Sequence, residues 1–317
     1  MGSAKRVFIT GGAGFIGSSL AARLADQNKI VLYDNLHRNA LGNTALLNHP
    51  NVEFFQGDVL DAAAVGRAMT GATHVFHLAA IAGVDTVLES PVRTMRVNLL
   101  GTVNVLEAAH RLTDLERFVD FSTSEVFGTH AYKVEETHIT SQGSVGEARW
   151  TYAISKLAGE YLSHSYYHEF GLPCVTVRPF NIYGPNQVGI GAIHHFIRRA
   201  LHNEDVEIHG DGSQIRAWCY ISDIVDALIL ILENTAAVGQ VFNIGNPRST
   251  VTIYDLAKHI IRLSGSASKM IFRPVNYVDV EIRVPSIEKA RTLLRFDPKI
   301  DLEEGLHSTI AWYRSHC

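Results

Sequence analysis

Short apolar runs alternate with longer segments of helical periodicity over residues 1–180. Each run is short, rich in Val, Ile and Phe, and is followed by glycine or polar residues, which is typical of a buried strand. We predict strands at Arg6–Thr10, Ile30–Tyr33, Val52–Gln56, His74–Leu78, Arg117–Phe121 and Pro173–Arg178. Strands that alternate with helices form a parallel sheet covered on both faces, so the pattern predicts an α/β fold with a doubly wound Rossmann sheet.

The periodic segments between these runs predict the helices. The main ones run from the glycine turn after Thr10 to about Gln27, then at Pro91–Leu112, Thr151–Phe170, Ala192–Asn203 and Ser222–Asn234. The segment from Tyr132 to Arg149 is polar and contains glycine. It is therefore predicted to be a loop at the rim of a substrate site.

The pattern changes after Pro179-Phe180-Asn181, where shorter and more varied elements begin, such as a strand at Val206–His209. We therefore predict two domains: residues 1–180 carry the sheet, and residues 181–317 form a smaller α/β domain for substrate. The apolar run Val241–Ile244 is predicted to return to the main sheet, so the two domains are interleaved.

A glycine motif links the first strand to the first helix. Gly11 and Gly14 allow a tight turn and a close approach to a pyrophosphate, and Gly17 lets the helix pack on the strand. Phe15 and Ile16 are candidates for the same site, because the N–H groups at a helix start bind phosphates. The motif predicts a dinucleotide cofactor.

The end of the second strand selects the cofactor. Asp34 can accept hydrogen bonds from ribose hydroxyls and would repel a 2′-phosphate, which favours NAD over NADP. Asn35, next in the chain, is a further candidate. Arg38 lies nearby and weakens the preference, because a cation suits a phosphate.

Further cofactor candidates follow the third and fourth strands. Leu78-Ala79-Ala80 are small or apolar residues that suit a flat ring. Asp58 at a strand end can reach an adenine amino group, or it can cap the helix that starts near Asp61; both readings stay open. Val59 follows Asp58.

Tyr152 and Lys156 stand four residues apart in a predicted helix, so they share one face. An ammonium beside a phenol favours the phenolate, which can act as a base near neutral pH. Ser122 to Gly128 supply hydroxyls and a carboxylate at the end of the fifth strand, where open α/β sheets bind ligands. Asn98, a poor helix former inside a predicted helix, either holds backbone near Tyr152 or is a buried amide.

Composition excludes several classes. The net charge of −4 gives no reason to expect nucleic acid or an anionic membrane as partner, and no apolar run is long enough to span a bilayer. The three cysteines, Cys174, Cys219 and Cys317, are scattered without metal-ligand spacing. Their odd number indicates a reducing, cytoplasmic setting. We interpret His74 and His77, which alternate on one strand, as structural residues and predict no metal.

Five motifs together resemble the extended short-chain dehydrogenase/reductases that modify nucleotide sugars. They are TGGAGFIG (Thr10 to Gly17), STSEVFG (Ser122 to Gly128), YAISK (Tyr152 to Lys156), RPFNIYGP (Arg178 to Pro185) and GDGSQIRAWCYISD (Gly210 to Asp223). The resemblance implies that Tyr152 removes the proton of the sugar C4 hydroxyl, that Thr123 hydrogen-bonds the same oxygen, and that Lys156 holds the nicotinamide ribose and lowers the pKa of the tyrosine. NAD would accept the C4 hydride.

The resemblance also assigns the nucleotide sugar, most often a UDP-sugar, to a set of polar residues. These are Ser124, Asn181, Arg216 and Gln214, although a surface ion pair is the other reading of Arg216. It further implies a homodimer joined through the helices at Pro91–Leu112 and Thr151–Phe170. Leu99, Val103, Leu106, Leu157 and Tyr161 are candidates for that contact, or they pack on the sheet.

Within this branch, Glu125 stands at a position where dehydratases and decarboxylases resemble one another in carrying a carboxylate. Arg149-Trp150 and the segment around Arg283 are similar to UDP-glucuronic acid decarboxylases, in which the matching arginine acts beside the substrate carboxylate; a surface charge is the other reading of Arg283. Such decarboxylases carry a tyrosine where this chain has Val87, and Ala79 to Val84 look more like UDP-glucuronic acid 4-epimerases. We expect a decarboxylase, then a 4-epimerase, then a 4,6-dehydratase.

Overall fold

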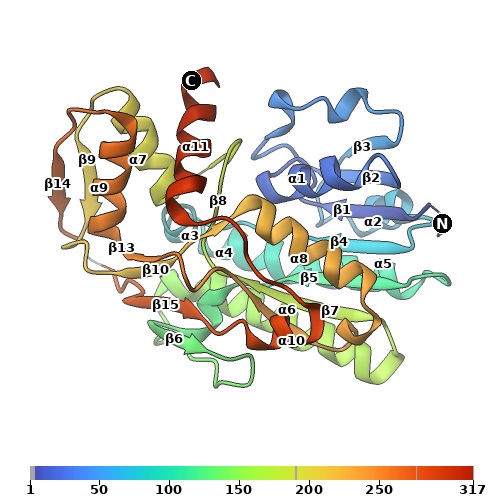
Figure 1. Ribbon diagram of the computed structural model, residues 1–317. Helices are drawn as coiled ribbons and strands as arrows, with labels where there is room; N and C mark the ends of the chain where they lie inside the picture. Colours follow the sequence, from blue (N-terminus) through green and yellow to red (C-terminus); the bar gives the residue numbers. More distant parts are fainter. Residues whose placement is uncertain (1–3, 190, 276, 317) are drawn as a thin grey trace.

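The computed structural model describes residues 4–189, 191–275 and 277–316; Cys317 therefore lies outside the described residues. Figure 1 shows a large sheet with helices on its faces on the right and a smaller group of helices and strands on the left.

The large sheet has seven strands, and every neighbouring pair in it is parallel. The strands are β1 (Arg6–Thr10), β2 (Lys29–Asp34), β3 (Val52–Gln56), β4 (His74–His77), β5 (Arg117–Phe121), β7 (Cys174–Pro179) and β12 (Val241–Ile244), in the order β12-β7-β5-β4-β1-β2-β3. The strand order reverses beside β1, and ligands bind at the carboxyl ends of strands at such a reversal. β12, from the second half of the sequence, forms one edge of this sheet.

Helices cover both faces of the sheet, which explains why its strands are continuous apolar runs. α1 (Phe15–Leu24), α8 (Ile221–Glu233) and α10 (Glu288–Leu294) share one core with Val7 and Ile9. α2 (Ala62–Met69), α5 (Gly101–His110) and α6 (Thr151–Phe170) cover the other face, where Phe8 points. The doubly wound α/β fold is confirmed.

The helix predicted at Pro91–Leu112 is not continuous. It consists of α4 (Pro91–Met95), a π-helical turn η3 (Arg96–Leu100) and α5. Fully buried Asn98 lies in η3, and its side chain accepts from the N–H of Ile81 at 2.8 Å and donates to the Ile81 carbonyl at 3.0 Å and to Ser155 Oγ at 3.0 Å. Both readings of Asn98 thus hold: the amide is buried and satisfied, and it ties backbone to the helix of Tyr152.

The smaller part packs α7 (Ala192–Leu201), α9 (Ile253–Ser264) and α11 (Leu302–His316) around its own core. Beside them is a four-stranded sheet in the order β13-β10-β15-β6. Its strands are β13 (Thr250–Thr252), β10 (Ile215–Ala217), β15 (Ile282–Pro285) and β6 (His130–Val134). The loop predicted from Tyr132 to Arg149 is therefore wrong at both ends: β6 pairs with β15, and η5 (Ala148–Trp150) is a 3-10 turn. The polar sequence of β6 reflects its exposed side chains.

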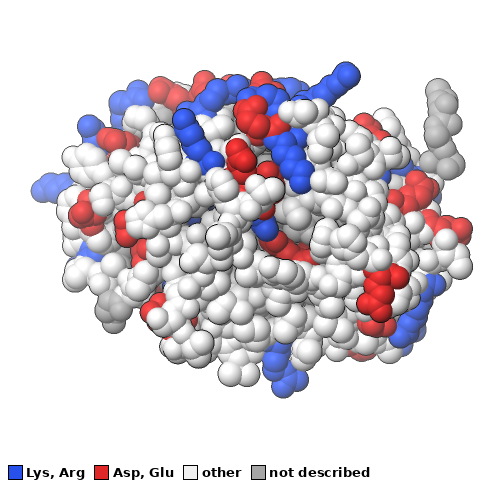
Figure 2. All heavy atoms as spheres, turned by 90° about the horizontal axis from the view of Figure 1, so that it is seen from below, with Lys and Arg blue, Asp and Glu red and all other residues white. Residues whose placement is uncertain are grey.

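The remaining elements are short. They are α3 (Val84–Glu89), the pairs β8 (Ile182–Tyr183) with β11 (Cys219–Tyr220) and β9 (Val206–His209) with β14 (Met270–Arg273), and the 3-10 turns η1 (Leu41–Asn43), η2 (Leu46–Asn48), η4 (Ser124–Phe127) and η6 (Thr235–Ala237). Among the described residues, no helix is both long and apolar enough to cross a membrane. On the face shown in Figure 2, charged side chains of both signs are interspersed and much of the middle is uncharged.

Candidate active site

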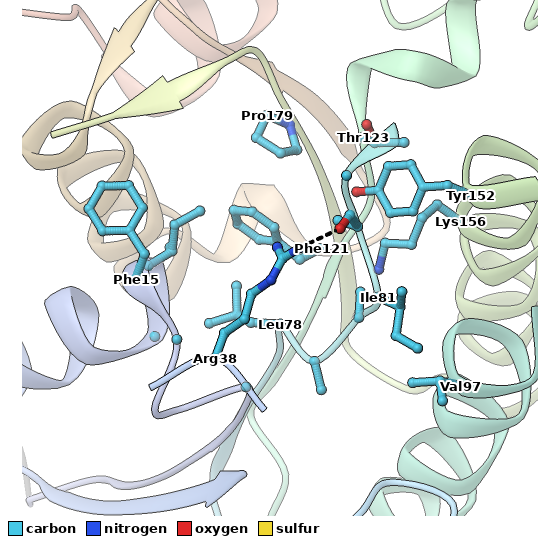
Figure 3. Close-up of a pocket in the computed structure, with 18 of the residues that line it drawn as sticks. Phe15, Arg38, Leu78, Ile81, Val97, Phe121, Thr123, Tyr152, Lys156 and Pro179 are labelled. Carbon is cyan, nitrogen blue, oxygen red and sulfur yellow. Dashed lines mark hydrogen bonds between the residues drawn. The ribbon is translucent and has the colours of Figure 1, made fainter. Parts of the chain in front are cut away.

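A cavity of about 420 Å³ opens at the carboxyl ends of β1, β2, β4, β5 and β7. Figure 3 shows its arrangement: Phe15 lies on one side, Thr123, Tyr152 and Lys156 lie on the other, and Arg38 extends between them. Of the candidates from the sequence, the lining contains Gly11, Gly14, Phe15, Ile16, Gly17, Asp34, Asn35, Val59, Leu78, Ala79, Ala80, Thr123, Ser124, Glu125, Tyr152, Lys156, Asn181 and Arg283.

The glycine turn fits a dinucleotide pyrophosphate. Gly11 has φ +68°, and a Cβ there would lie 2.7 Å from the backbone nitrogen of Ala79, so only glycine fits. A Cβ at Gly17 would lie 2.3 Å from the Gly11 carbonyl oxygen. Gly14 precedes α1, whose start carries no side-chain cap and no acidic residue. The first N–H groups of α1 are thus available to an anion.

Asp34 lies where a ribose carboxylate is expected, at the end of β2. One of its oxygens accepts from the N–H of Ala13 at 3.1 Å and the other from that of Leu36 at 2.7 Å. Burial raises the pKa of Asp34, and these two bonds act against the increase. The bonds fix the carboxylate and leave its remaining lone pairs for ribose hydroxyls.

Arg38 follows in the same loop and crosses the cavity. Its Nη2 donates to the Ala82 carbonyl at 2.7 Å, the bond dashed in Figure 3. Gly189 packs on the guanidinium, because a Cβ there would lie 3.0 Å from Arg38 Cζ. From the sequence, Arg38 was only an argument against NAD; the structure makes it part of the cavity wall.

Tyr152 and Thr123 meet on one side of the cavity, Tyr152 from the first turn of α6 and Thr123 from the end of β5. Their side chains are hydrogen-bonded. Thr123 Oγ1 also accepts from the N–H of Glu125 at 3.2 Å, so the threonine proton is directed to another acceptor, the phenol oxygen. The predicted pairing of base and alcohol is present in the structure.

The pKa of Tyr152 is raised to about 12, because burial and the charge of Glu125 raise it by more than Thr123, Arg283 and Arg38 lower it. Lys156 is buried on the same face of α6, but the charges that act on it are those of Asp120 and Glu160. Burial lowers the pKa of Lys156, and those two carboxyls raise it by less. The cations found to lower the pKa of Tyr152 are thus two arginines, and a contribution of Lys156 stays a prediction.

Glu125 is the centre of a cluster of arginines. Its Oε2 accepts from Arg149 Nη1 at 2.6 Å, and its Oε1 lies 3.5 Å from Arg283 Nη1. Burial raises the pKa of Glu125, but the charges of Arg283, Arg149 and Arg216 lower it by more, so the pKa lies below its usual value. Glu125 is thus a carboxylate at neutral pH.

Arg283 is 93% buried on β15 rather than on the surface, so the reading of Arg283 as a surface charge is wrong. Its Nε and Nη2 are buried and have no hydrogen-bond partner among the described residues. One edge of the guanidinium is therefore free, and Arg283 lines the cavity. A planar fork of two N–H groups matches a carboxylate or a phosphate.

Four candidates from the sequence are not among the described residues that line the cavity: Asp58, Asn98, Gln214 and Arg216. Asp58 accepts from Asn35 Nδ2 at 3.2 Å and from the N–H of Leu60; Asp61, rather than Asp58, caps α2. Gln214 donates to the His209 carbonyl at 3.0 Å.

Arg216 is buried beside Arg283, in register with it on the neighbouring strand. It lies 3.5 Å from Asp279, and burial together with Arg283 lowers its pKa to about 10. The reading of Arg216 as a surface residue is therefore wrong, because Arg216 is buried and only its partner Asp279 is partly exposed. Arg149 entered the sequence analysis only as part of the Arg149-Trp150 motif, and its burial follows from tertiary packing.

His77 is fully buried between two hydroxyls. Its Nδ1 is bonded to Thr10 Oγ1 at 2.8 Å and its Nε2 to Thr102 Oγ1 at 2.9 Å. Burial lowers the pKa of His77 to about 3, and Lys156 adds to the decrease. Its role in linking β1, β4 and α5 is structural.

The chain matches a family model, curated relatives and solved structures. Residues 7–245 match the model of the NAD dependent epimerase/dehydratase family. The UDP-N-acetyl-alpha-D-glucosaminuronate decarboxylase of Bacillus cytotoxicus is 35% identical over 98% of both chains. The UDP-glucuronic acid decarboxylase 1 of Xenopus tropicalis is 32% identical over 98% of this chain and 72% of its own. The crystal structure of UDP-glucuronic acid 4-epimerase from Bacillus cereus, with UDP-glucuronic acid and NAD, has a TM-score of 0.91 at 30% identity, over 98% of this chain and all of that one.

Proposed function

Because the chain belongs to the NAD dependent epimerase/dehydratase family, we propose that it is an enzyme that oxidises C4 of a UDP-uronic acid and releases the carboxyl group as carbon dioxide. One observation carries this proposal. Glu125 and Arg283 face each other in the cavity that also contains Thr123 and Tyr152. Charged groups for a carboxylate thus lie beside groups for oxidising a hydroxyl.

The oxidation is assigned to α6 and the end of β5. Tyr152 takes the proton of the C4 hydroxyl, and Thr123 hydrogen-bonds the same oxygen. Bound NAD supplies the hydride acceptor and a positively charged ring that favours the phenolate. Lys156 and the small or apolar residues Leu78-Ala79-Ala80 are proposed to hold the nicotinamide half, and Asp34, Asn35 and Val59 the adenosine half. Asp58, which lies outside the lining and accepts a hydrogen bond from Asn35, stays a prediction for the adenosine half.

A ketone at C4 lies beta to the carboxyl group of a uronic acid, so carbon dioxide leaves readily and its electron pair is delocalised into the ketone. The free Nε–Nη2 edge of Arg283 is proposed to hold the carboxylate before it leaves. The nearby charges support this, because Arg149, Arg216 and Arg283 outnumber Glu125 and Asp279 by one positive charge. A buried cluster with an excess positive charge favours an anionic group in the cavity.

The nucleotide portion is assigned less fully. Ser124 and Asn181 line the cavity and are proposed to contact the substrate. Gln214 and Arg216 stay predictions for the diphosphate, and residues 181–317 stay the proposed substrate domain. Arg216 already interacts with Asp279 and with two backbone carbonyls, so it is proposed to act mainly by supporting Arg283.

A 4-epimerase is the second candidate. At the position where the decarboxylases carry a tyrosine, this chain has Val87, which has no phenol and is buried in α3. The segment Ala79 to Val84 resembles 4-epimerases, and its residues from Ala79 to Gly83 line the cavity. The Bacillus cereus neighbour has a 4-epimerase title, which is consistent with this alternative. A 4,6-dehydratase is third.

The reaction is tested by incubating the NAD-loaded enzyme with UDP-glucuronic acid, with its 2-acetamido analogue and with UDP-glucose, and weighing the nucleotide products by mass spectrometry. The proposal expects loss of carbon dioxide from a uronic acid. An unchanged mass with a new stereoisomer would support the 4-epimerase, and loss of water from UDP-glucose the dehydratase.

We also propose a homodimer formed through α4, η3 and α6. Exposed apolar side chains lie on this side, including Val92 at 72% and Tyr161 at 68% exposure, with Leu100 and Ile154. Leu106 is fully buried, so the structure assigns it to the core instead. The cytoplasmic location stays a prediction from the sequence.

A further inference from the structure

We propose that Arg149 is a positioning residue that keeps Glu125 a carboxylate and fastens the end of β5, with Thr123, to the start of α6, with Tyr152. The inference rests on the proposed decarboxylation for its effect on rate. Its structural part does not depend on the substrate.

The geometry of Arg149 separates it from the reacting groups. Among the described residues, Arg149 is not part of the cavity lining, whereas Glu125 and Arg283 are. Arg149 is 5% exposed in η5, the 3-10 turn directly before α6. Its Nη1 donates to Glu125 Oε2 at 2.6 Å, the shorter of the two arginine contacts of that carboxylate. Arg149 thus contacts Glu125 without being one of the described residues that line the cavity.

Arg149 itself packs on a buried aromatic ring. Its guanidinium lies over the Trp150 ring, 5.4 Å from the centroid. Trp150 is buried with Ala153 and Val280, and its Nε1 donates to Glu147 at 2.8 Å. A guanidinium that packs on the buried Trp150 ring has few alternative conformations, so Arg149 loses little conformational entropy when it binds the Glu125 carboxylate.

This pair connects the two segments that must align. The N–H of Glu125 donates to Thr123 Oγ1, so the position of the glutamate backbone also sets the threonine hydroxyl. Arg149 precedes Tyr152 by three residues, at the same end of α6. The buried Arg149–Glu125 contact therefore joins the same two segments as the Thr123–Tyr152 hydrogen bond, the end of β5 and the start of α6.

The charge of Glu125 depends on groups from several elements. Arg283 comes from β15 and Arg216 from β10, and both lower the pKa of Glu125. Tyr152 on α6 is affected by the charge of Glu125, and Asp279, between β14 and β15, pairs with Arg216. Burial alone raises the pKa of Glu125, and the arginines reverse this. Arg149 supplies both a charge and a hydrogen bond, so its loss removes two of the contributions that lower the pKa.

The test compares Arg149→Met with Arg149→Lys and with Arg111→Met, a matched change at an exposed arginine. Steady-state carbon dioxide release is measured against substrate concentration at several pH values. Arg149→Met is expected to move the acid limb up by about one to two pH units and to lower kcat at neutral pH about tenfold or more, with little change in KM. Arg149→Lys restores the limb because it keeps the charge, but not the full kcat. An acid limb that stays in place in Arg149→Met overturns the proposal.

A second measurement separates this inference from the proposed reaction. Urea midpoints are recorded from neutral to acidic pH for Glu125→Gln in the wild-type and in the Arg149→Met background. Since the pKa of folded Glu125 lies below its usual value, wild type is expected to lose the stabilising effect of Glu125 as the pH falls through that folded pKa. In Arg149→Met the folded pKa moves towards or above that of the unfolded chain, so this loss is expected to become smaller or to reverse. Equal pH dependence in both backgrounds overturns the proposal, even if the enzyme releases no carbon dioxide.

Discussion

Glu125 Oε1 lies 3.5 Å from Arg283 Nη1, although the two residues come from different sheets. Glu125 follows β5 of the large sheet, and Arg283 lies on β15 of the small one. β15 reaches this position because it pairs with β6, the strand that directly follows the Glu125 turn. A strand of the small sheet thus places the Arg283 guanidinium in the cavity that also contains the hydroxyls of Thr123 and Tyr152.

Arg283→Met is expected to weaken binding of UDP-glucuronic acid about 10- to 100-fold, because a charge-assisted pair with the carboxylate is lost. Binding of UDP-glucose, which has no carboxylate, should change little. Calorimetric titration of NAD-loaded enzyme with both nucleotides measures the difference. Equal weakening for both sugars would place Arg283 at the diphosphate instead.

Gly11→Ala is expected to abolish tight NAD binding, since the added Cβ would overlap the backbone of Ala79 and the φ of +68° is unfavourable for alanine. Gly42→Ala is the matched control, because a Cβ there meets nothing within 4 Å. Fluorescence titration with NAD compares the two variants. If Gly11→Ala bound NAD as well as the control does, the proposed pyrophosphate site would be wrong.

Arg38→Met is expected to shift the rising limb that reports ionisation of Tyr152 to higher pH, by about half to one unit. This limb lies at higher pH than the acid limb assigned to Glu125. Arg38 is one of the cations that lower the pKa of Tyr152, so the phenolate becomes less accessible without it. Rates are measured at saturating NAD and substrate. Arg23→Met, at an exposed arginine, should leave the limb in place; a limb that also stays in place in Arg38→Met contradicts the assignment of that limb to Tyr152.

His77→Gln is expected to reduce acid sensitivity. Folded His77 has a pKa of about 3, whereas the unfolded chain binds that proton from about pH 6.5 downward, so folding stability falls as the pH drops below 6.5. The contribution is about 1.4 kcal/mol per pH unit. Urea unfolding at several pH values should show a shallower decline for His77→Gln than for His307→Gln, an exposed control. Equal slopes would mean that His77 does not stay neutral in the fold.

Local pattern was sufficient for most of the large sheet. Its strands are buried on both faces and therefore read as apolar runs, and the glycine turn and the Tyr152–Lys156 spacing need only a few neighbouring residues. β6 was missed because most of its side chains are exposed and its sequence is polar. The break at η3 was missed because the bonds of Asn98 to Ile81 and Ser155 join distant parts of the chain.

The site was predicted only where one segment carries it. Thr123, Tyr152 and Asp34 each follow from a strand end or a helix spacing. The assembly of Arg149, Glu125 and Arg283 depends on how β15 pairs with β6 and on the turn before α6, which are tertiary features. The pKa of Tyr152 could not be predicted either, because it depends on burial and on Arg38 and Arg283.

The central claim is that Tyr152 removes a proton from a sugar hydroxyl as NAD is reduced. It is tested most directly by mixing NAD-loaded enzyme with UDP-glucuronic acid and following the absorbance of reduced nicotinamide in a single turnover. Wild type and Tyr161→Phe, a control at an exposed tyrosine of α6, are expected to show the signal, and Tyr152→Phe to lose it by about a factor of 100 or more in rate. Reduction of NAD at the wild-type rate in Tyr152→Phe would contradict the account.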